Sequence, residues 1–588
     1  GAVAALAAEL DDPWGAAVDA QGAIYVSDRG EAMCVRVFAH DGKPLRTIGK
    51  PGGRPALGRF DPDGMFHPRG IAVDAQGKLW VTESDNTPRR ISVWDTRCGK
   101  LLADLLGPGH YAINGAVDLA RPSWANTHHT LFEVDYATGA VKTLATLLRP
   151  RGLQFGTDGD ANPVFFRHCK GRTYLVHCGR EVTVIFLFDE KRLCGEPVAA
   201  ITGRTAARLA GIAPERFPES QRELARQKLG DDRQLHLWTD RNGDRMIQLD
   251  EIVAEPTGAP GGALWGVYWG VHVDDDLTIW AATAYNAGYV WRVPVREFLA
   301  DGTPVYPPPS EQKPLFKAQY PDVISGTLPA EDGWSVYLIE QAGGDARGGG
   351  SKMAISRYAL DGRRLWAYRK TWTGFALDAP LYRPGYVIGA MKFCARLDAP
   401  GGPGELVMVN GYHGQFNLLT DEGLWVAALA SDNRFSPTMS EHTYYVENFS
   451  GFFFRNRDNG RYYYIAGETD TRIMEITGLE TIRAGSLPLA LTADDARRAA
   501  EAAARRGAVP GEKPLLVVRR ATVEIDGALD DWPREAMIEL DAGGGRSARM
   551  AAGRDDRNLY LAYDVVDDSP MRNVGSDFAM LFKSGDTC

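Results

Sequence analysis

The sharpest chemical pattern in the sequence is a run of oxygen-bearing side chains between Asp240 and Glu251. Carboxylates or amides stand at the first, third, fifth, ninth and last positions of this run, and the seventh residue offers its backbone carbonyl. Hard divalent cations prefer such oxygen ligands. We therefore predict a calcium ion with a structural role, bound by Asp240, Asn242, Asp244, Met246, Gln248 and Glu251.

This spacing resembles the loop of the EF-hand family, in which the last residue binds the ion through both carboxylate oxygens. The sequence departs from the family at the sixth position. Glycine is required there for a sharp turn, but Arg245 occupies it and Gly243 stands two residues earlier. An acidic surface turn without an ion is the alternative interpretation of the same residues.

Histidines are the second set of candidate groups, because a neutral imidazole can act as a base or a ligand near neutral pH. The eleven histidines are scattered along the chain, so a site made from them must be assembled from distant segments. The candidate ligand-binding residues are His67, His129, His168, Trp265, Trp269, His272, His413 and His442. For each one alone, a structural histidine or a core aromatic is the competing interpretation. No nucleophile elbow, zinc motif or phosphate-binding loop assigns a catalytic residue.

Two closely matched copies of one unit indicate how such residues are positioned. The segment Asp12–Gly22 recurs as His67–Gly77, and its glycine shifts by 55 residues, from position 15 to position 70. Each copy continues into short strands, Ile24–Asp28 in the first and Leu79–Glu83 in the second. The unit resembles the NHL repeat, whose family fold is a β-propeller of four-stranded blades. Looser strand pairs continue to about residue 476.

The predicted fold is therefore all-β, with a propeller of about seven or eight four-stranded blades over residues 1–490 and a partial β-sandwich after it. Between residues 202 and 260 the strand pattern stops, and this stretch is expected to be a blade insertion with a short polar helix at Glu219–Lys228 and the calcium loop. Residues 491–513 are expected to form a helical linker that is capped by Thr492 and ends at Gly507.

The last segment, residues 514–588, contains Ile525-Asp526-Gly527, then Asp531-Trp532, and later the strand Asn558–Val565. It resembles the start of a family 9 carbohydrate-binding module, a β-sandwich that binds sugars by stacking aromatic rings on them. The chain covers only the first part of such a module, so none of the family's stacking residues is assigned here. Trp532 is expected to pack in the interior.

Composition limits the partners. The net charge of -10, without a basic stripe, argues against nucleic acid, and no apolar run reaches the roughly 20 residues of a membrane span. The seven cysteines form no metal or haem motif; Cys169 and Cys178 are expected either to pair across a hairpin or to remain isolated. The segment Gly1–Ala8 is either the remnant of a signal peptide or a first strand.

These features predict an extracytoplasmic protein, secreted or periplasmic, that binds a carbohydrate or another small-molecule ligand. The propeller would recognise or process a polysaccharide or glycan, and an enzymatic activity would be that of a glycoside hydrolase or a polysaccharide lyase. A non-catalytic binding platform and a propeller oxidoreductase are the alternatives. Convergence of histidines, arginines and carboxylates at one mouth of the channel would favour an enzyme. The oligomeric state stays open.

Overall fold

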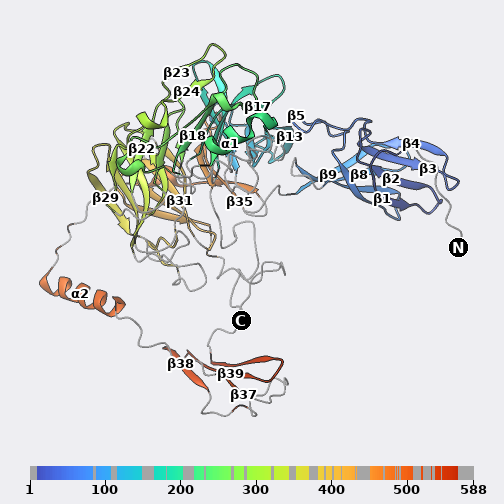
Figure 1. The fold of residues 1–588 in the computed structure, drawn as a ribbon. Coiled ribbons are helices and arrows are strands. Elements are labelled where there is room, and N and C mark those ends of the chain that lie inside the picture. Colours follow the sequence, from blue (N-terminus) through green and yellow to red (C-terminus); the bar gives the residue numbers. More distant parts are fainter. Residues whose placement is uncertain are drawn as a thin grey trace. The chain divides into compact units, whose positions relative to one another are not determined.

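The structure, a computed structural model, is built mainly of strands, as the all-β prediction requires (Figure 1). The described residues are 10–83, 88–107, 115–148, 164–179, 182–202, 217–230, 233–265, 271–283, 288–319, 323–342, 352–369, 382–389, 392–399, 403–411, 413–430, 432, 451–467, 471–483, 485, 488, 490, 492–507, 518–520, 532, 537–543 and 546–566. The chain divides into two compact units, residues 1–483 and 484–588. The segment Gly1–Ala8 lies outside the described residues.

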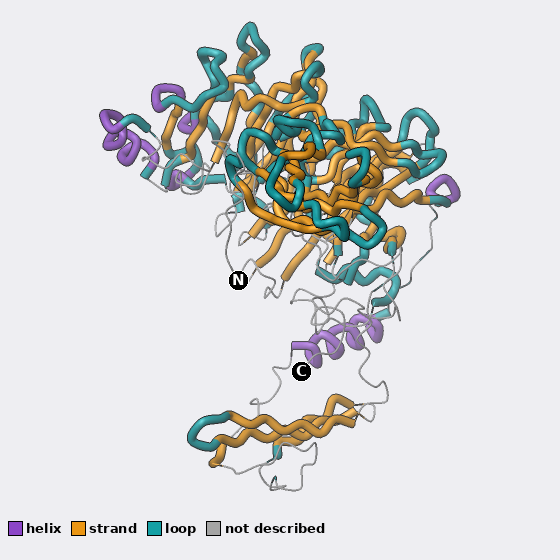
Figure 2. Tube along the Cα trace, turned by 90° about the vertical axis from the view of Figure 1, so that its right-hand side faces the viewer, coloured by secondary structure: helices purple, strands orange, loops and turns teal. Residues whose placement is uncertain are grey.

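Six antiparallel sheets follow one another through the first unit, from residue 115 to residue 476. Many of their strands are buried along nearly their whole length, because each sheet is covered on both faces by its neighbours. Their strands are β10 (Gly115–Val117), β11 (Trp124–Thr127), β12 (Thr130–Val134), β13 (Val141–Thr146), β14 (Val164–Cys169), β15 (Arg172–Cys178), β16 (Thr183–Asp189), β17 (Cys194–Thr202), β18 (Leu235–Thr239), β19 (Ile252–Glu255), β20 (His272–Val273), β21 (Ile279–Ala282), β22 (Tyr289–Val293), β25 (Phe316–Lys317), β26 (Val323–Pro329), β27 (Ser335–Ala342), β28 (Lys352–Ala359), β29 (Arg364–Arg369), β30 (Phe393–Ala399), β31 (Gly404–Asn410), β32 (Phe416–Thr420), β33 (Trp425–Leu429), β34 (Gly451–Arg455), β35 (Tyr462–Gly467) and β36 (Thr471–Ile476). Figure 2 shows strands throughout this unit, with helices confined to short segments.

The six sheets close into a ring. The first or second strand of each sheet contacts the first strand of the next, so these strands surround a common axis. The last sheet returns to the first, since Phe452 and Phe454 of β34 pack with Ala116 and Val117 of β10 in one apolar cluster. Contact between the last and first sheets is what makes the fold a β-propeller rather than an open array.

The two closely matched repeats form a pair of four-stranded sheets that precede the ring in sequence. Their strands are β1 (Pro13–Val18), β2 (Ile24–Asp28), β3 (Cys34–Phe38), β4 (Pro44–Ile48), β6 (Pro68–Val73), β7 (Lys78–Glu83), β8 (Arg89–Asp95) and β9 (Leu101–Gly107). Tyr25 and Val35 of the first sheet pack with Leu79 and Val81 of the second. The intervening β5 (Gly58–Arg59) pairs with β13. The described residues thus contain eight sheets of blade type, but six of them close the ring, fewer than the seven or eight blades predicted for the propeller.

The predicted insertion extends the sheet that begins with β14. Its polar helix is present as a 3-10 turn, Glu219–Gln221, followed by α1 (Arg222–Leu229). The expectation that strands stop here is wrong, because β18 and β19 add two strands to the outer edge of the sheet. The side chains of Leu235–Thr239 are buried throughout, which explains why this segment pairs with the sheet instead of looping over it.

The second unit contains α2 (Ala493–Gly507), as predicted, and one small sheet. Thr492 caps the helix, since its hydroxyl accepts a hydrogen bond from the backbone nitrogen of Asp495 at 3.2 Å. The sheet consists of β37 (Val518–Arg520), β38 (Ile538–Gly543), β39 (Arg546–Arg554) and β40 (Leu559–Val566). Trp532 is buried with Ala551 and Ala562, which confirms its predicted packing role. The Ile525–Asp531 opening lies outside the described residues.

The structure bears on two predictions, the absence of a membrane-spanning helix and the possible Cys169–Cys178 pair. None of the described helices combines the length and the hydropathy that crossing a bilayer requires. None of the described cysteines forms a disulfide, so Cys169 and Cys178 are not joined across the hairpin. Cys169 pairs with Arg172 at the β14–β15 turn, whereas Cys178 lies at the far end of β15 opposite Thr183.

Candidate functional site

A cavity of about 290 Å³ lies on the axis of the ring. Five of the six sheets contribute their first strands to its wall, and Leu119, just after β10, completes it from the remaining sheet. The wall combines phenyl rings with charged groups, among them Phe165, Arg167, His272, Asp274, Asp275, Glu331, Phe393, Arg396 and Phe452. Histidine, arginine and carboxylate side chains therefore line one cavity, with His272 as the one histidine in its wall.

The centre of the charged group is a histidine and an aspartate on β20 and its following turn. His272 Nε2 lies 3.1 Å from Asp274 Oδ1, and Trp280 Nε1 donates to Asp274 Oδ2 at 2.7 Å. The segment has the same local order as the N-terminal repeats, in which Asp74 accepts a hydrogen bond from Trp80 at 2.9 Å. Leu277 adopts a φ of +63° at the turn position where the second repeat has a glycine. The repeat turn therefore fixes the carboxylate that holds His272.

Two arginines from other sheets flank this pair. Arg396 of β30 places Nε 2.8 Å from Glu331 and its terminal nitrogen 3.8 Å from Asp274. Arg167 of β14 donates through Nε to the carbonyl of Val273 at 2.6 Å. Both guanidinium groups are largely buried, and an arginine stays charged even there. The cavity wall consequently presents fixed positive and negative groups side by side.

The local environment sets the protonation states. Burial lowers the pKa of His272, so its imidazole is neutral at neutral pH. Burial opposes ionisation of Asp274, but hydrogen bonds from His272 and Trp280 and the nearby Arg396 outweigh it and lower the pKa of the carboxyl to about 2. Because Asp274 is ionised, Nε2 of the neutral imidazole keeps the proton and Nδ1 is left as the proton acceptor.

Two cysteines also line the cavity, and their protonation excludes one kind of chemistry. Burial raises the pKa of Cys178 and of Cys394 to about 12. A thiol with such a pKa is not a thiolate at neutral pH and is a poor nucleophile. The groups suited to reaction are therefore the neutral imidazole, as a base, and the guanidinium groups, as partners of a negatively charged substrate.

Among the candidate histidines that the structure describes, only His272 lines this cavity. His67 directly precedes β6 in the N-terminal pair, has a φ of +46°, and stacks on Phe66 with ring centroids 4.2 Å apart. His129 is buried between β11 and β12, and His413 is buried in the β31–β32 turn with a φ of +60°. These three lie in turns of separate sheets.

His168 and Trp265 have other roles. His168 Nε2 lies 2.7 Å from the buried Asp118, outside the cavity wall. Trp265 is fully buried and its indole donates to Gln312 at 2.8 Å, so it is part of the core. Trp269 and His442 lie outside the described residues.

Sequence reasoning missed the partners of His272. Arg167, Asp274 and Arg396 come from three different sheets and share no spacing, so no local motif joins them. One signal was present for Asp274. It follows a valine and precedes an aromatic residue by six positions, as Asp74 does in the second repeat, which marks it as the structural aspartate of a degenerate copy.

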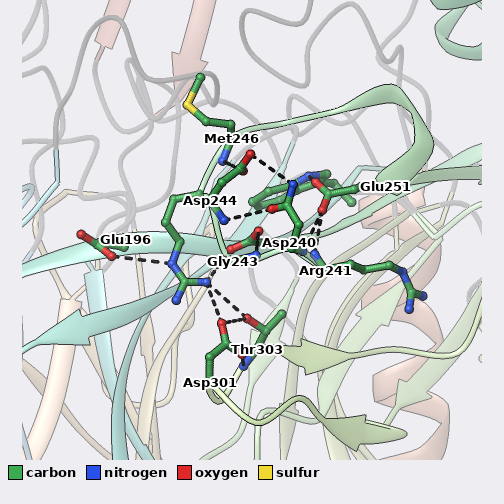
Figure 3. Close-up of polar contacts among 12 residues, drawn as sticks. Glu196, Asp240, Arg241, Gly243, Asp244, Met246, Glu251, Asp301 and Thr303 are labelled. Atoms are coloured by element: carbon green, nitrogen blue, oxygen red, sulfur yellow. Dashed lines mark hydrogen bonds and ion pairs between the residues drawn. The ribbon is translucent and has the colours of Figure 1, made fainter.

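The predicted calcium loop connects β18 to a 3-10 turn, Leu249–Glu251, and then to β19 (Figure 3). Its carboxylates bond to the loop itself. Asp240 Oδ1 accepts from the backbone nitrogen of Gly243 at 2.9 Å, and Asp244 Oδ1 accepts from that of Met246 at 2.8 Å. The loop thus has the tight local turns that its sequence predicts.

The other candidate ligands are also occupied. Glu251 Oε1 accepts from the backbone nitrogen of Arg241 at 2.7 Å, and its Oε2 accepts from the indole of Trp238 at 3.0 Å. The amides of Asn242 and Gln248 bond to the carboxylate of Asp244. Among the described residues, no group of three or more His, Cys, Asp or Glu side chains is placed to hold a metal ion. The donor set does not fit calcium in this conformation, and calcium binding stays a prediction.

Comparison with known proteins gives one family match. The NHL repeat matches residues 10–38, the first of the two N-terminal copies. No curated protein matches the chain. Virginiamycin B lyase from Staphylococcus aureus is a similar solved structure with 10% identity, covering 70% of this chain and 92% of that one at a TM-score of 0.21. BamB from Moraxella catarrhalis has 11% identity, covering 78% and 96% at a TM-score of 0.25.

Those TM-scores are too low for either structure to bear on function. The NHL match covers residues 10–38 alone, and the closed ring of six sheets makes the fold of the first unit a β-propeller. Such a fold indicates a binding or scaffold function, without specifying a ligand or a reaction.

Proposed function

We propose that the propeller binds a sugar residue of a polysaccharide or glycan in the axial cavity. The observation that supports this most is the wall of the cavity, where Phe165, Phe393 and Phe452 stand among guanidinium, imidazole and carboxylate groups. A pyranose ring has apolar faces that pack on aromatic side chains and hydroxyls that bond to charged groups. A volume of about 290 Å³ is at the lower end for ligand pockets and suits one sugar unit rather than a long segment.

The second unit supports the same class of ligand. Its sequence resembles the start of a family 9 carbohydrate-binding module, in the strand Asn558–Val565 above all. A protein with two carbohydrate-directed parts belongs where polysaccharides are found. We therefore propose an extracytoplasmic location, secreted or periplasmic.

His272 favours a second candidate function, a polysaccharide lyase acting on uronate units. In this elimination a neutral base takes the proton from C5, the C4–O bond breaks, a C4–C5 double bond forms and the leaving oxygen takes up a proton. The neutral imidazole of His272 is suited to the first step. A guanidinium such as that of Arg167 would stabilise the uronate carboxylate as charge develops on it.

Glycan-array binding by the full-length chain, followed by titration calorimetry with the best ligand, tests the proposed site. His272→Gln should weaken binding at least tenfold, because it replaces the imidazole by a flexible amide that does not keep the position of the ring nitrogens in the wall. His168→Gln is the matched control, since it also breaks a histidine–aspartate pair but one outside the cavity. Equal affinity in both variants and the parent would contradict binding at the axis. Loss of binding only on deletion of residues 484–588 would assign it to the second unit.

The lyase candidate has its own readout. Uronate polysaccharides such as polygalacturonate, alginate and hyaluronan should yield an unsaturated product that absorbs in the ultraviolet. His272→Gln should lower that rate by about 100-fold or more if the imidazole is the base. Absence of the absorbance with all three substrates would leave the propeller as a binding protein.

A further inference from the structure

The Asp240–Glu251 loop retains the backbone feature of a calcium loop at its sixth position. Arg245 has a φ of +63°, in the left-handed region where the family places glycine. A side chain with a Cβ is strained in this conformation, at a cost of about 1 kcal/mol or more. An arginine therefore stands where glycine would adopt the same backbone conformation without strain. Another interaction must offset this cost.

The guanidinium supplies that interaction. It bonds to Asp240, the first residue of the loop, and lies 2.9 Å from Asp301 Oδ2 (Figure 3). Its Nε is 3.6 Å from Glu196 of β17. The side chain of Asp240 is completely buried, so its charge requires a close positive partner. One cation thus faces three carboxylates, which is the electrostatic arrangement that a metal ion would provide.

The third partner comes from a different part of the ring. Asp301 lies in the turn between two short strands, β23 (Glu297–Phe298) and β24 (Pro304–Val305), which are inserted in the next sheet. Asp301 is held by Thr303, whose hydroxyl and backbone nitrogen both donate to it at 3.0 Å. A guanidinium has several donors in a plane and can bond to carboxylates on separate segments at once. Arg245 consequently connects two insertions on neighbouring sheets.

We propose that the guanidinium of Arg245 takes the place of a calcium ion in this loop and fixes the loop to the β23–β24 hairpin. The consequence is a loop whose stability does not depend on the calcium concentration. The oxygens that would bind the ion are matched with hydrogen-bond donors of the chain instead. This proposal is independent of the function proposed for the axial cavity.

Calcium titration of the wild type and of Arg245→Gly tests the proposal. The substitution restores the family's glycine and frees Asp240, so it should create a calcium site with a Kd on the order of 0.1–1 mM. In EDTA the variant should melt below the wild type, and about 10 mM CaCl2 should raise its Tm by about 2 °C or more. The Tm of the wild type should not change. Arg241→Gly, which removes the same charge from the same loop, should behave like the wild type.

Terbium luminescence gives a second readout, because Trp238 bonds directly to Glu251 and lies close enough to sensitise an ion in the loop. Arg245→Gly should give at least tenfold more sensitised emission with TbCl3 than the wild type, and excess CaCl2 should abolish it. Equal emission from the wild type would overturn the proposal, as would a calcium-dependent rise in its Tm.

A variant that keeps Arg245 covers the case in which Arg245→Gly does not fold. Asp301→Asn removes one partner of the guanidinium and leaves the loop sequence intact. It should lower the Tm by about 2 °C at any calcium concentration. An unchanged Tm would contradict the connection between the loop and the hairpin.

Discussion

The Asp240–Glu251 loop and the axial cavity both gather charged side chains, but they do so in opposite ways. The loop takes nearly all of its charges from one short segment, and their polar atoms are matched within the loop or by Arg245 and Asp301. The cavity takes its charges from separate sheets and leaves about 290 Å³ beside them. The difference shows what separates two clusters of charged residues: in the loop the polar atoms are matched by other groups of the chain, whereas at the axis they lie beside open volume.

The two regions should also differ in what a substitution changes. In the loop, charges stabilise one another, so removing one should lower the free energy of unfolding. In the cavity, the polar and aromatic groups face an opening, so conservative changes should alter ligand affinity more than stability. The following variants test this contrast.

The largest effect is expected for Asp240→Ala. Its carboxylate is completely buried and bonds to Arg245 and to the backbone of Gly243. Removing one partner of a buried ion pair costs about 3 kcal/mol, so urea unfolding should show a loss of that size. A loss below about 1 kcal/mol would mean that the loop is not held by this pair.

A smaller effect, on binding rather than stability, is expected for Phe393→Leu in the cavity wall. Leucine keeps most of the volume but lacks the aromatic face, so glycan affinity should fall about fivefold, while the free energy of unfolding should change by less than about 1.5 kcal/mol. Phe188→Leu is the control, because Phe188 is buried in a ring sheet away from the cavity. Equal affinities in the two variants would argue against stacking at the axis.

The pH dependence of stability should reveal His272. Burial lowers its pKa in the folded protein, so the unfolded chain binds the proton first as the pH falls below about 6.5. Stability from this residue is complete above that pH and decreases on acidification, by at most about 1.4 kcal/mol per pH unit. Urea unfolding of the parent and of His272→Gln at several pH values measures it. If the unfolding free energy has the same slope against pH in both proteins between about pH 5 and pH 7, the imidazole is not buried in its neutral form.

The smallest effect is expected for Arg241→Gly. The side chain of Arg241 is exposed, and its backbone nitrogen, which donates to Glu251, is retained in the variant. Unfolding free energy should change by less than about 1 kcal/mol, the range of an exposed glycine substitution. A loss as large as that of Asp240→Ala would mean that general charge in the loop, not the specific pair, determines its stability.

Much of the fold could be predicted because the repeat is local. The alternation in Ile24–Asp28 and Leu79–Glu83 and the glycine turns before them specify hairpins without reference to the rest of the chain. Closure could not be predicted, because the packing of β34 against β10 joins residues far apart in sequence. Nor could the strand Leu235–Thr239, which is buried on both faces and so lacks the polar alternation of a surface strand.

The candidate sites show the same contrast between local features, which could be predicted, and long-range contacts, which could not. The loop was visible because its ligand positions are set by consecutive residues, yet the pairing of Arg245 with Asp301 depends on a hairpin of another sheet. His272 was among the candidates for its chemistry alone. What distinguishes it from the other described histidines is that it lines the same cavity as Arg167 and Arg396. These three residues come together only when the ring closes.

A crystal structure of the chain with the best ligand from the glycan array tests the central claim most directly. Electron density for one sugar unit is expected in the axial cavity, in contact with Phe393 and within hydrogen-bond distance of His272 or Arg396. Density for the sugar elsewhere on the propeller, with the axial cavity containing only water, would contradict it.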